Sequence, residues 1–419
     1  MFRLEIEYKN YIFLLFPLTL LLGSAVVNLF LILGTVYFLH YISKNKVKLL
    51  NYNWEYFIYL FISYVIILSF FSNEPYQSLK SSISQIRFLF FSFFLSLINF
   101  DKIFTSFKNI LILILIFVCI DTNIQFIFGY DIFGTPAEGY KVEKYPIFSH
   151  WINKDIVLGR LSGPFGTELI PGAFIASLSS PLIFYFLKNI QLKDYKKIFF
   201  ILLLFESTLI TGERLAFLMI FFCIFFASLL RFTLQKVLTC ILLLLISLTL
   251  VLNFSKNNFL KKRWVDAYSI AKNISSSSYG RIYLSAIYIW KENKLFGTGL
   301  KNYRFECTKL KDPNPKSLHN FCSPTHPHNL YLELLVETGV IGIFLYILFY
   351  LSLVSSLFRN LRIKNKKKYH FFIMGSFFYL IFKLLPLPSG SVFSTWNASF
   401  FWFHLGICLN YVYSKKFKK

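Results

Sequence analysis

Charged residues are scarce in this chain. Asp, Glu, Lys and Arg make up 15% of its 419 residues, whereas about 25% is usual for a soluble protein. Hydrophobic residues make up 56%. A composition this apolar excludes a soluble enzyme, an intrinsically disordered protein and a small disulfide-stabilised scaffold. It predicts an all-α, polytopic integral membrane protein that is surrounded by membrane lipids.

Acidic residues are the rarer charged class, with 20 against 44 basic residues and a net charge of +24. Such an excess raises the question of nucleic-acid binding. The basic residues lie mostly between apolar segments. We therefore attribute them to membrane topology and anionic lipid, and we expect no nucleic-acid partner.

Cysteine is also infrequent, with six residues in all. Cys307 and Cys322 lie in one long polar stretch, where either a structural disulfide or two free thiols fits the sequence. A zinc site made by these two with His319, His326 and His328 is a weaker alternative, because the spacing fits no recurrent zinc template. The other four lie in apolar segments and are interpreted as small core residues: Cys119, Cys223, Cys240 and Cys408.

Twelve segments are candidates for a spanning helix, which needs about 20 mainly apolar residues. The first is interpreted as an uncleaved anchor. The first two share one apolar run that is broken at Gly23 and Ser24, so eleven spans is the alternative. The twelve are Tyr11–Leu22, Ala25–Tyr41, Trp54–Ser72, Ser82–Phe100, Asn109–Phe128, Glu168–Leu187, Ile198–Thr211, Leu215–Phe232, Val237–Phe254, Gly339–Phe358, Tyr369–Leu387 and Phe393–Tyr413.

The orientation follows from the Lys and Arg residues of the short connections, which accumulate on the cytoplasmic side. With twelve spans and both termini inside, 23 basic residues fall on inner segments and six on short outer ones. This predicts that both termini lie on the cytoplasmic side. The six outer residues are Lys80, Lys141, Lys144, Lys154, Arg160 and Arg214.

Two outer segments, Gly129–Thr167 and Ser255–Pro327, are long enough to hold chemistry. We accordingly divide the chain into three parts. Residues 1–254 form the first nine spans and include the outer loop 129–167. Residues 255–338 form a large outer loop between spans 9 and 10, with short helices and an amphipathic helix. Residues 339–419 form the last three spans and a basic tail.

The amphipathic helix is predicted to begin near Pro327, which suits a first helical turn, with Thr325 or His326 as its cap. His328 then lies in the first turn, where the positive end of the helix dipole disfavours imidazolium. A neutral imidazole can serve as the general base for a sugar hydroxyl. A capping or packing role for His328 is the more common alternative.

A resemblance to a known family shifts that balance. His328-Asn329, nine residues, Gly339, two residues and Gly342 match the H-[NSQ]-x9-G-x-x-[GTY] pattern of the O-antigen ligase and O-antigen polymerase superfamily. The order of the motifs along the chain makes the resemblance specific. Three further stretches resemble the same family: Thr211–Ala216, Gly280-Arg281 followed by Trp290 and Leu295–Leu300, and Gly159–Phe165.

The resemblance implies glycan transfer from undecaprenyl diphosphate to an acceptor at the periplasmic face of a bacterial inner membrane, without nucleotide, metal or other cofactor. No D-x-D or E-x-D pair lies on an outer segment, and a divalent cation would need paired acidic ligands. The family ties Arg at the positions of Arg214 and Arg281 to activity. Arg suits a diphosphate because its planar guanidinium can bind two oxygens.

The predicted catalytic residues are therefore His328, Arg214 and Arg281. We favour a ligase, which moves finished polymer onto a lipid A-core sugar. The alternatives are a polymerase, which moves growing polymer onto the next lipid-linked repeat unit, and transfer to another acceptor such as protein or a different surface glycan. A transporter would show internal repeats and broken helices with polar residues at the midplane; no repeat is visible, and the candidate chemical residues cluster on one side. The predicted substrate-binding residues are Arg160, Asn329, Glu213, His326 and Arg304.

Overall fold

A computed structural model describes most of the chain. The described residues are 10–45, 52–138, 159–188, 193–235, 277–310, 325–362 and 368–413, together with 190, 191, 237, 242, 246, 262–266, 270, 272–274 and 322. Over these residues the regular structure is helical, and extended pairing is limited to two isolated bridges, Tyr130 with Pro136 and Asn329 with Pro388. The predicted all-α class is confirmed for this part of the chain.

Several predicted features lie outside the described residues. They include most of the ninth predicted span, parts of both long outer loops, and the basic C-terminal tail. The individual residues concerned are Lys141, Lys144, Lys154, Cys240 and His319.

The other predicted spans each overlap a helix. Three helices within the described residues are long and apolar enough to cross a membrane: Ser24–Asn45, Phe100–Phe128 and Leu330–Leu361. Shorter apolar helices cover Asn53–Ser69, Arg214–Leu229 and His370–Phe382. The protein is thus a helical membrane protein, while the total of twelve spans stays a prediction.

The chain forms two compact units. Unit 1 comprises Met1–Gly23, Asn99–Ser269 and Lys366–Tyr379, and unit 2 comprises Ser24–Ile98, Ile270–Asn365 and Leu380–Lys419. Each unit therefore combines segments from the beginning, middle and end of the sequence. The predicted three-part division by chain position remains a prediction.

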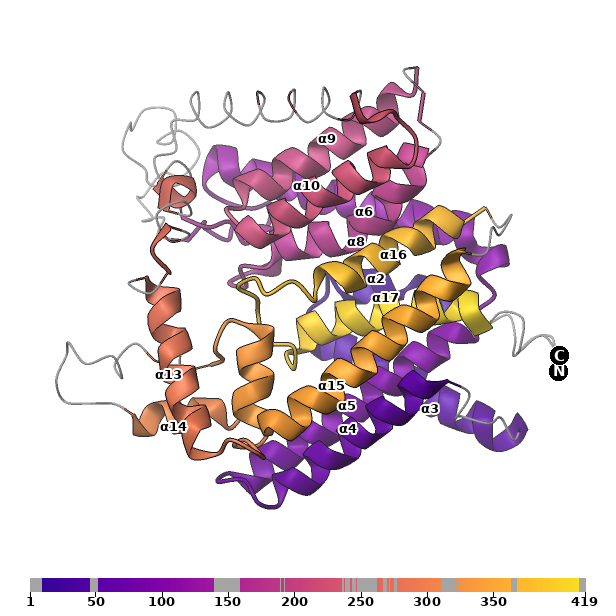
Figure 1. Ribbon diagram of the computed structural model, residues 1–419. Coiled ribbons are helices and arrows are strands. Elements are labelled where there is room, and N and C mark those ends of the chain that lie inside the picture. The colour runs from indigo at the N-terminus through magenta and orange to yellow at the C-terminus, as the bar shows by residue number, and fades with distance from the viewer. Residues whose placement is uncertain are drawn as a thin grey trace. The chain divides into compact units, whose positions relative to one another are not determined.

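Unit 1 is built around α8, which packs against α6, α9 and α10 (Figure 1). Nearly all of α8 is buried, and its small residues allow neighbouring backbones to approach closely. The elements of this unit are α2 (Phe16–Thr19), α6 (Phe100–Phe128), η1 (Gly163–Phe165), α8 (Pro171–Lys188), α9 (Tyr195–Ile210), α10 (Arg214–Leu229) and most of α16 (His370–Phe382).

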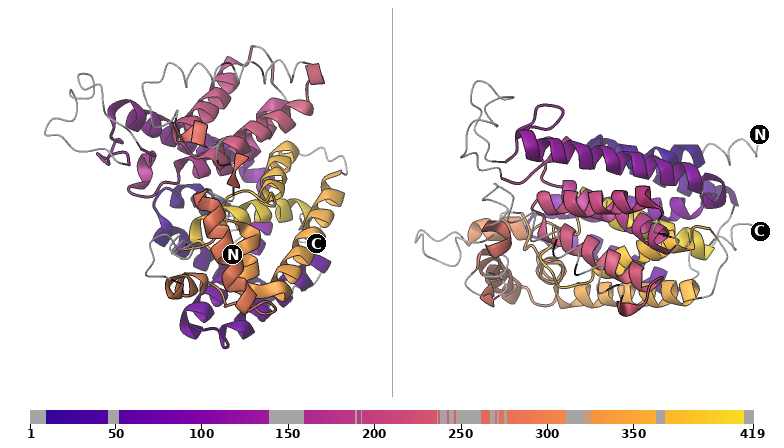
Figure 2. Two further views of the ribbon diagram at one scale, coloured as in Figure 1. Left: turned by 60° about the vertical axis from the view of Figure 1, so that its left-hand side comes forward. Right: turned by 90° about the horizontal axis from the view of Figure 1, so that it is seen from above.

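In unit 2, α5 packs against α3, α4 and α17, and α15 packs against α4 and α13. The helices α13 and α14 lie at one end of this bundle, as Figure 1 and the right-hand view of Figure 2 show. The elements are α3 (Ser24–Asn45), α4 (Asn53–Ser69), α5 (Pro75–Ser96), α13 (Ser278–Glu292), α14 (Tyr303–Lys309), α15 (Leu330–Arg362) and α17 (Thr395–Tyr413).

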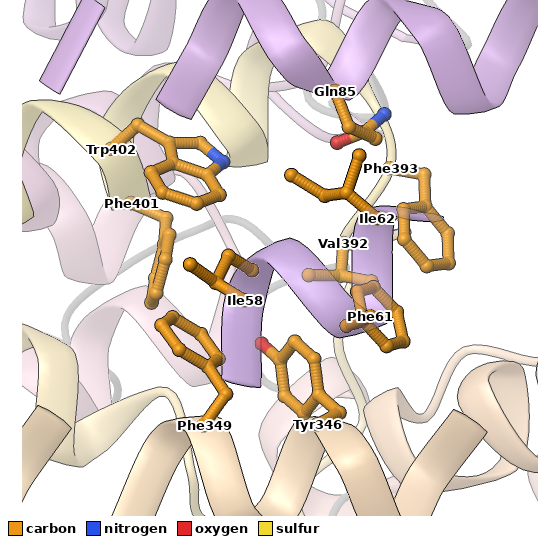
Figure 3. A pocket seen from close by; sticks show the side chains of 10 residues that line it. All are labelled: Ile58, Phe61, Ile62, Gln85, Tyr346, Phe349, Val392, Phe393, Phe401 and Trp402. Atoms are coloured by element: carbon orange, nitrogen blue, oxygen red, sulfur yellow. The ribbon is translucent and has the colours of Figure 1, made fainter. Parts of the chain in front are cut away.

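A small cavity of about 30 Å³ lies among the helices of unit 2. Its lining is almost entirely apolar, and Figure 3 shows the side chains facing one another around it. Val392 and Phe393 reach it from the connection between α16 and α17. The remaining lining residues come from α4, α5, α15 and α17: Ile58, Phe61, Ile62, Gln85, Tyr346, Phe349, Phe401 and Trp402.

Candidate functional site

His328 lies just before α15 rather than inside it. The helix begins at Leu330, and Asn329 caps it by accepting hydrogen bonds on Oδ1 from the N–H groups of Tyr331 (3.0 Å) and Leu332 (3.2 Å). The predicted helix start near Pro327 is therefore wrong. Asn is among the strongest N-cap residues, and Asn329 marks the end of the non-helical segment that precedes the helix. His328 therefore lies outside the first helical turn of α15, contrary to the prediction.

The backbone of His328 is held in an unusual conformation. Its φ is 54°, in the left-handed region that costs a non-glycine residue about 1–3 kcal/mol and persists only where the surroundings impose it. The surroundings here are an extended segment from the connection between α16 and α17. Ser389 donates its N–H to the His328 carbonyl at 2.9 Å, and Asn329 forms a bridge with Pro388.

The His328 ring is packed among other rings. The ring centroid of His326 lies 4.1 Å from that of His328, and Tyr279 presents its ring edge-on at 6.1 Å. Burial lowers the pKa of His328, and burial together with the neighbouring His328 charge lowers the pKa of His326 to about 4. Both imidazoles are therefore neutral at pH 7, and the cause for His328 is desolvation rather than a helix dipole.

After the first two turns of α15, the helix turns sharply at Gly339, whose φ of 65° and ψ of −170° interrupt it (Figure 1). A Cβ at Gly339 would lie 2.2 Å from the Leu295 carbonyl oxygen, and one at Gly297 would lie 2.5 Å from the Gly339 nitrogen. Val340 donates its N–H to the Lys294 carbonyl at 3.0 Å. Two of the motif stretches found in the sequence thus meet in space.

Arg281 lies in the first turn of α13, which Ser277 caps by accepting the Gly280 N–H at 3.1 Å. The helix packs on α15 through a small buried core of Ala286, Ile289, Tyr303, Cys307 and Val336. This packing joins α13, which carries Arg281, to α15, which begins two residues after His328.

The helix α14 carries Arg304 and is anchored in two ways. Asn73 donates to the Glu306 carboxylate at 2.6 Å. Cys307 is joined to Cys322 by a disulfide with the Cα atoms 5.6 Å apart.

Two buried carboxylates on α15 were not among the predicted site residues. Glu333 is 2% exposed and Glu337 is 1% exposed. Lys301 and Arg304 interact electrostatically with both. Burial and Arg304 lower the pKa of the Lys301 ammonium, while the two carboxylates oppose this effect. The sequence shows the four-residue spacing of the two Glu residues, but this spacing carries no information on burial.

In unit 1, Glu213 caps α8. Its carboxylate accepts the N–H groups of Gly172 (2.9 Å) and Ala173 (3.1 Å), in the first turn of that helix. Burial raises the pKa of Glu213, while the charge of Arg160 opposes the shift. Arg160 thus interacts with Glu213 electrostatically, and the carboxylate accepts its hydrogen bonds from helix amides.

Arg214 opens α10 and makes a reciprocal contact with Arg263, which sequence reasoning missed. The Arg214 guanidinium donates to the Arg263 carbonyl, and the Arg263 Nε donates to the Gly212 carbonyl, both at 2.5 Å. Trp264 packs edge-on against Phe217 with ring centroids 5.0 Å apart. The stretch 262–266 is thus attached to the turn before α10.

Arg160 belongs to a turn that Gln125 organises. The Gln125 Oε1 accepts the N–H groups of Ser162 (2.9 Å) and Gly163 (2.8 Å). The Arg160 guanidinium donates to the Leu169 carbonyl at 3.0 Å. Gln125 was not singled out from the sequence, since a Gln within an apolar run gives no sign of its partners.

The structure assigns the predicted site residues to both units. Unit 2 contains His328, His326, Asn329, Arg281 and Arg304, and unit 1 contains the remaining ones, Arg160, Glu213 and Arg214. Within the part of the chain that the structure describes, no group of three or more His, Cys, Asp or Glu side chains could hold a metal ion.

Over the residues that the structure describes, the fold is that of a helical membrane protein, with three helices long and apolar enough to cross a membrane. Residues 199–347 match the family model of the O-antigen ligase. This stretch contains Arg214, Arg281 and His328, and it confirms the resemblance to the O-antigen ligase superfamily. No curated protein matches the chain.

Proposed function

We propose that the protein is a glycosyltransferase of the O-antigen ligase type, which transfers a glycan from undecaprenyl diphosphate to lipid A-core in lipopolysaccharide biosynthesis. The observation that carries the proposal is His328. It lies in the stretch that matches the family model, its backbone is clamped in a left-handed turn, and burial keeps its imidazole neutral.

In this proposal His328 is the general base. Its free nitrogen removes the proton from the acceptor hydroxyl, and the oxygen attacks the anomeric carbon of the donor glycan. The new C–O bond forms as the bond to the diphosphate breaks, and the diphosphate leaves with the electron pair. A single displacement of this kind inverts the configuration at the anomeric carbon.

The leaving diphosphate requires cations, which Arg214 and Arg281 supply in the proposal, with Arg160 as a further contact. Guanidinium groups bind phosphate oxygens in pairs, so they neutralise charge and fix orientation together. No metal or other cofactor is needed in this scheme. His326, Asn329 and Arg304 line the acceptor side near His328, and Glu213 maintains the α8 end beside Arg160.

We propose further that both termini lie in the cytoplasm and that the site faces the periplasm. The support is the distribution of basic residues among the short connections. The partners are then the undecaprenyl diphosphate-linked donor, the lipid A-core acceptor and the surrounding lipids. A polymerase, which would transfer the growing chain to the next lipid-linked repeat unit, shares all of these features.

The lipopolysaccharide profile of a deletion strain separates these activities. Bare lipid A-core, with long polymer accumulating on undecaprenyl diphosphate, is the result expected of a ligase. Core carrying a single repeat unit would indicate a polymerase. An unchanged ladder without trapped lipid-linked glycan would contradict both. Complementation with the wild-type chain and with His328→Ala serves as the matched control pair.

A further inference from the structure

The buried carboxylate of Glu333 holds the connection between α16 and α17. Its oxygens accept hydrogen bonds from the Ser391 hydroxyl and from the Val392 N–H, the latter at 2.9 Å. The side chain is 2% exposed. A buried carboxyl group is tolerated only where such donors satisfy its oxygens.

The same connection continues directly to His328. Ser389, two residues before Ser391, donates its N–H to the His328 carbonyl at 2.9 Å, and Pro388 forms the bridge with Asn329. The contacts of Glu333, His328 and Asn329 therefore fall within five consecutive residues, 388–392. A displacement of one end of this segment is transmitted to the other over a few peptide bonds.

The segment is also fixed from the side of α17. The Ser391 carbonyl accepts hydrogen bonds from the Asn397 side chain (3.0 Å) and the Ser394 hydroxyl (2.9 Å). On the other side, Tyr331 donates its hydroxyl to the Leu384 carbonyl at 2.5 Å. Residues 384–394 are thus held between the start of α15 and the start of α17.

We propose that Glu333 is a positioning residue for His328, acting through residues 388–392. The proposal rests on the proposed function, because it assumes that the orientation of the His328 ring matters for transfer. A left-handed non-glycine residue keeps its conformation only while its neighbours impose it. In this proposal Glu333 fixes the segment that imposes the conformation, and it acts without contacting the glycan donor or the glycan acceptor.

Hydrogen exchange of the purified full-length protein tests the mechanical link without relying on activity. Glu333→Ala should increase exchange in peptides covering 384–394, because Ser391 and Val392 lose their acceptor. Glu333→Gln retains one carbonyl oxygen and should restore most of the protection. The matched control is Glu306→Gln, which alters another buried acidic residue of unit 2 and should leave these peptides unchanged.

Transfer kinetics test the consequence. Glu333→Ala should lower kcat about tenfold or more while KM changes less than about twofold, the pattern of a displaced base rather than of a lost substrate contact. Glu333→Gln should recover most of kcat. Should Glu333→Ala fail to accumulate, Ser391→Ala removes one donor from the opposite side and should produce a smaller effect in the same direction.

The hydrogen-exchange and kinetic experiments together distinguish a failure of this proposal from a failure of the proposed function. Unchanged exchange at 384–394 in Glu333→Ala would overturn the positioning role, as would a raised KM with an unchanged kcat. Wild-type turnover in His328→Ala would overturn the base assignment. The exchange result would still show whether Glu333 orders the segment next to His328.

Discussion

Gly297 and Gly339 touch each other through their backbones, and both have positive φ, 76° and 65°. The first lies in the loop after α13, and the second marks the turn within α15. A Cβ atom added to either glycine would overlap backbone atoms of the other segment. This contact joins two of the sequence stretches that carry the family resemblance. It also fixes the position of the sharp turn between the first two turns of α15 and the rest of that helix.

A side chain at Gly339 should therefore lower the free energy of unfolding through two effects. One is the strained backbone conformation, and the other is the clash with the Leu295 carbonyl. We expect Gly339→Ala to lower the thermal midpoint of the detergent-solubilised protein clearly, consistent with a loss of several kcal/mol, about 1–3 of it from conformation alone. Gly134→Ala is the control, since Gly134 has φ 83° but nothing within 4 Å of its added Cβ. Equal losses in the two variants would contradict the steric account.

The disulfide between Cys307 and Cys322 should stabilise the α14 region. Closing a loop with a sequence separation of 15 is worth about 2–4 kcal/mol. Reducing agent, or Cys307→Ser together with Cys322→Ser, should lower the thermal midpoint. Cys223→Ser controls for the loss of a buried cysteine. Detection of two free thiols at 307 and 322 in protein isolated from an oxidising compartment would refute the pairing.

The pH dependence of transfer should report the lowered pKa of His328. Its ordinary value is 6.5 and burial moves it down, so the imidazole stays neutral as the pH falls through 6.5. We expect kcat/KM to remain level from pH 8 to below 6.5 and to decline only at lower pH. A rate that falls as the pH rises through 6.5 would indicate an essential imidazolium instead.

Arg214 should not be replaceable by Lys. If Arg214 binds the diphosphate with two nitrogens, Arg214→Lys should lose almost as much transfer as Arg214→Ala. The assay is the initial rate with a lipid-linked donor at several donor concentrations. Arg231→Lys offers a comparison, because Arg231 lies just beyond the other end of α10. Full activity of Arg214→Lys would show that a simple positive charge suffices.

The helices could be predicted because an apolar run long enough to span a membrane satisfies its own backbone hydrogen bonds by forming an α-helix. The predicted segments Ala25–Tyr41 and Trp54–Ser72 match α3 and α4 closely. The start of α15 was misplaced because Pro327 and Asn329 are both typical of helix starts, and only the contacts of Asn329 decide between them.

The candidate site was foreseeable where a residue type has a chemical signature in the motif, as with His328 and Arg281. It was not foreseeable where the role depends on packing. The burial of Glu333, the reciprocal contact of Arg263 with Arg214, and the turn around Gln125 all involve residues distant in sequence. Pairings of this kind leave no periodicity or spacing that one sequence can reveal.

The most direct test of the account is the transfer rate of His328→Ala in the full-length protein reconstituted into lipid vesicles. Removal of a general base should lower kcat by about 100-fold or more, while the yield of monodisperse protein stays close to wild type. His370→Ala, at the start of α16, should remain active. Wild-type turnover in His328→Ala would contradict the central claim that this imidazole activates the acceptor.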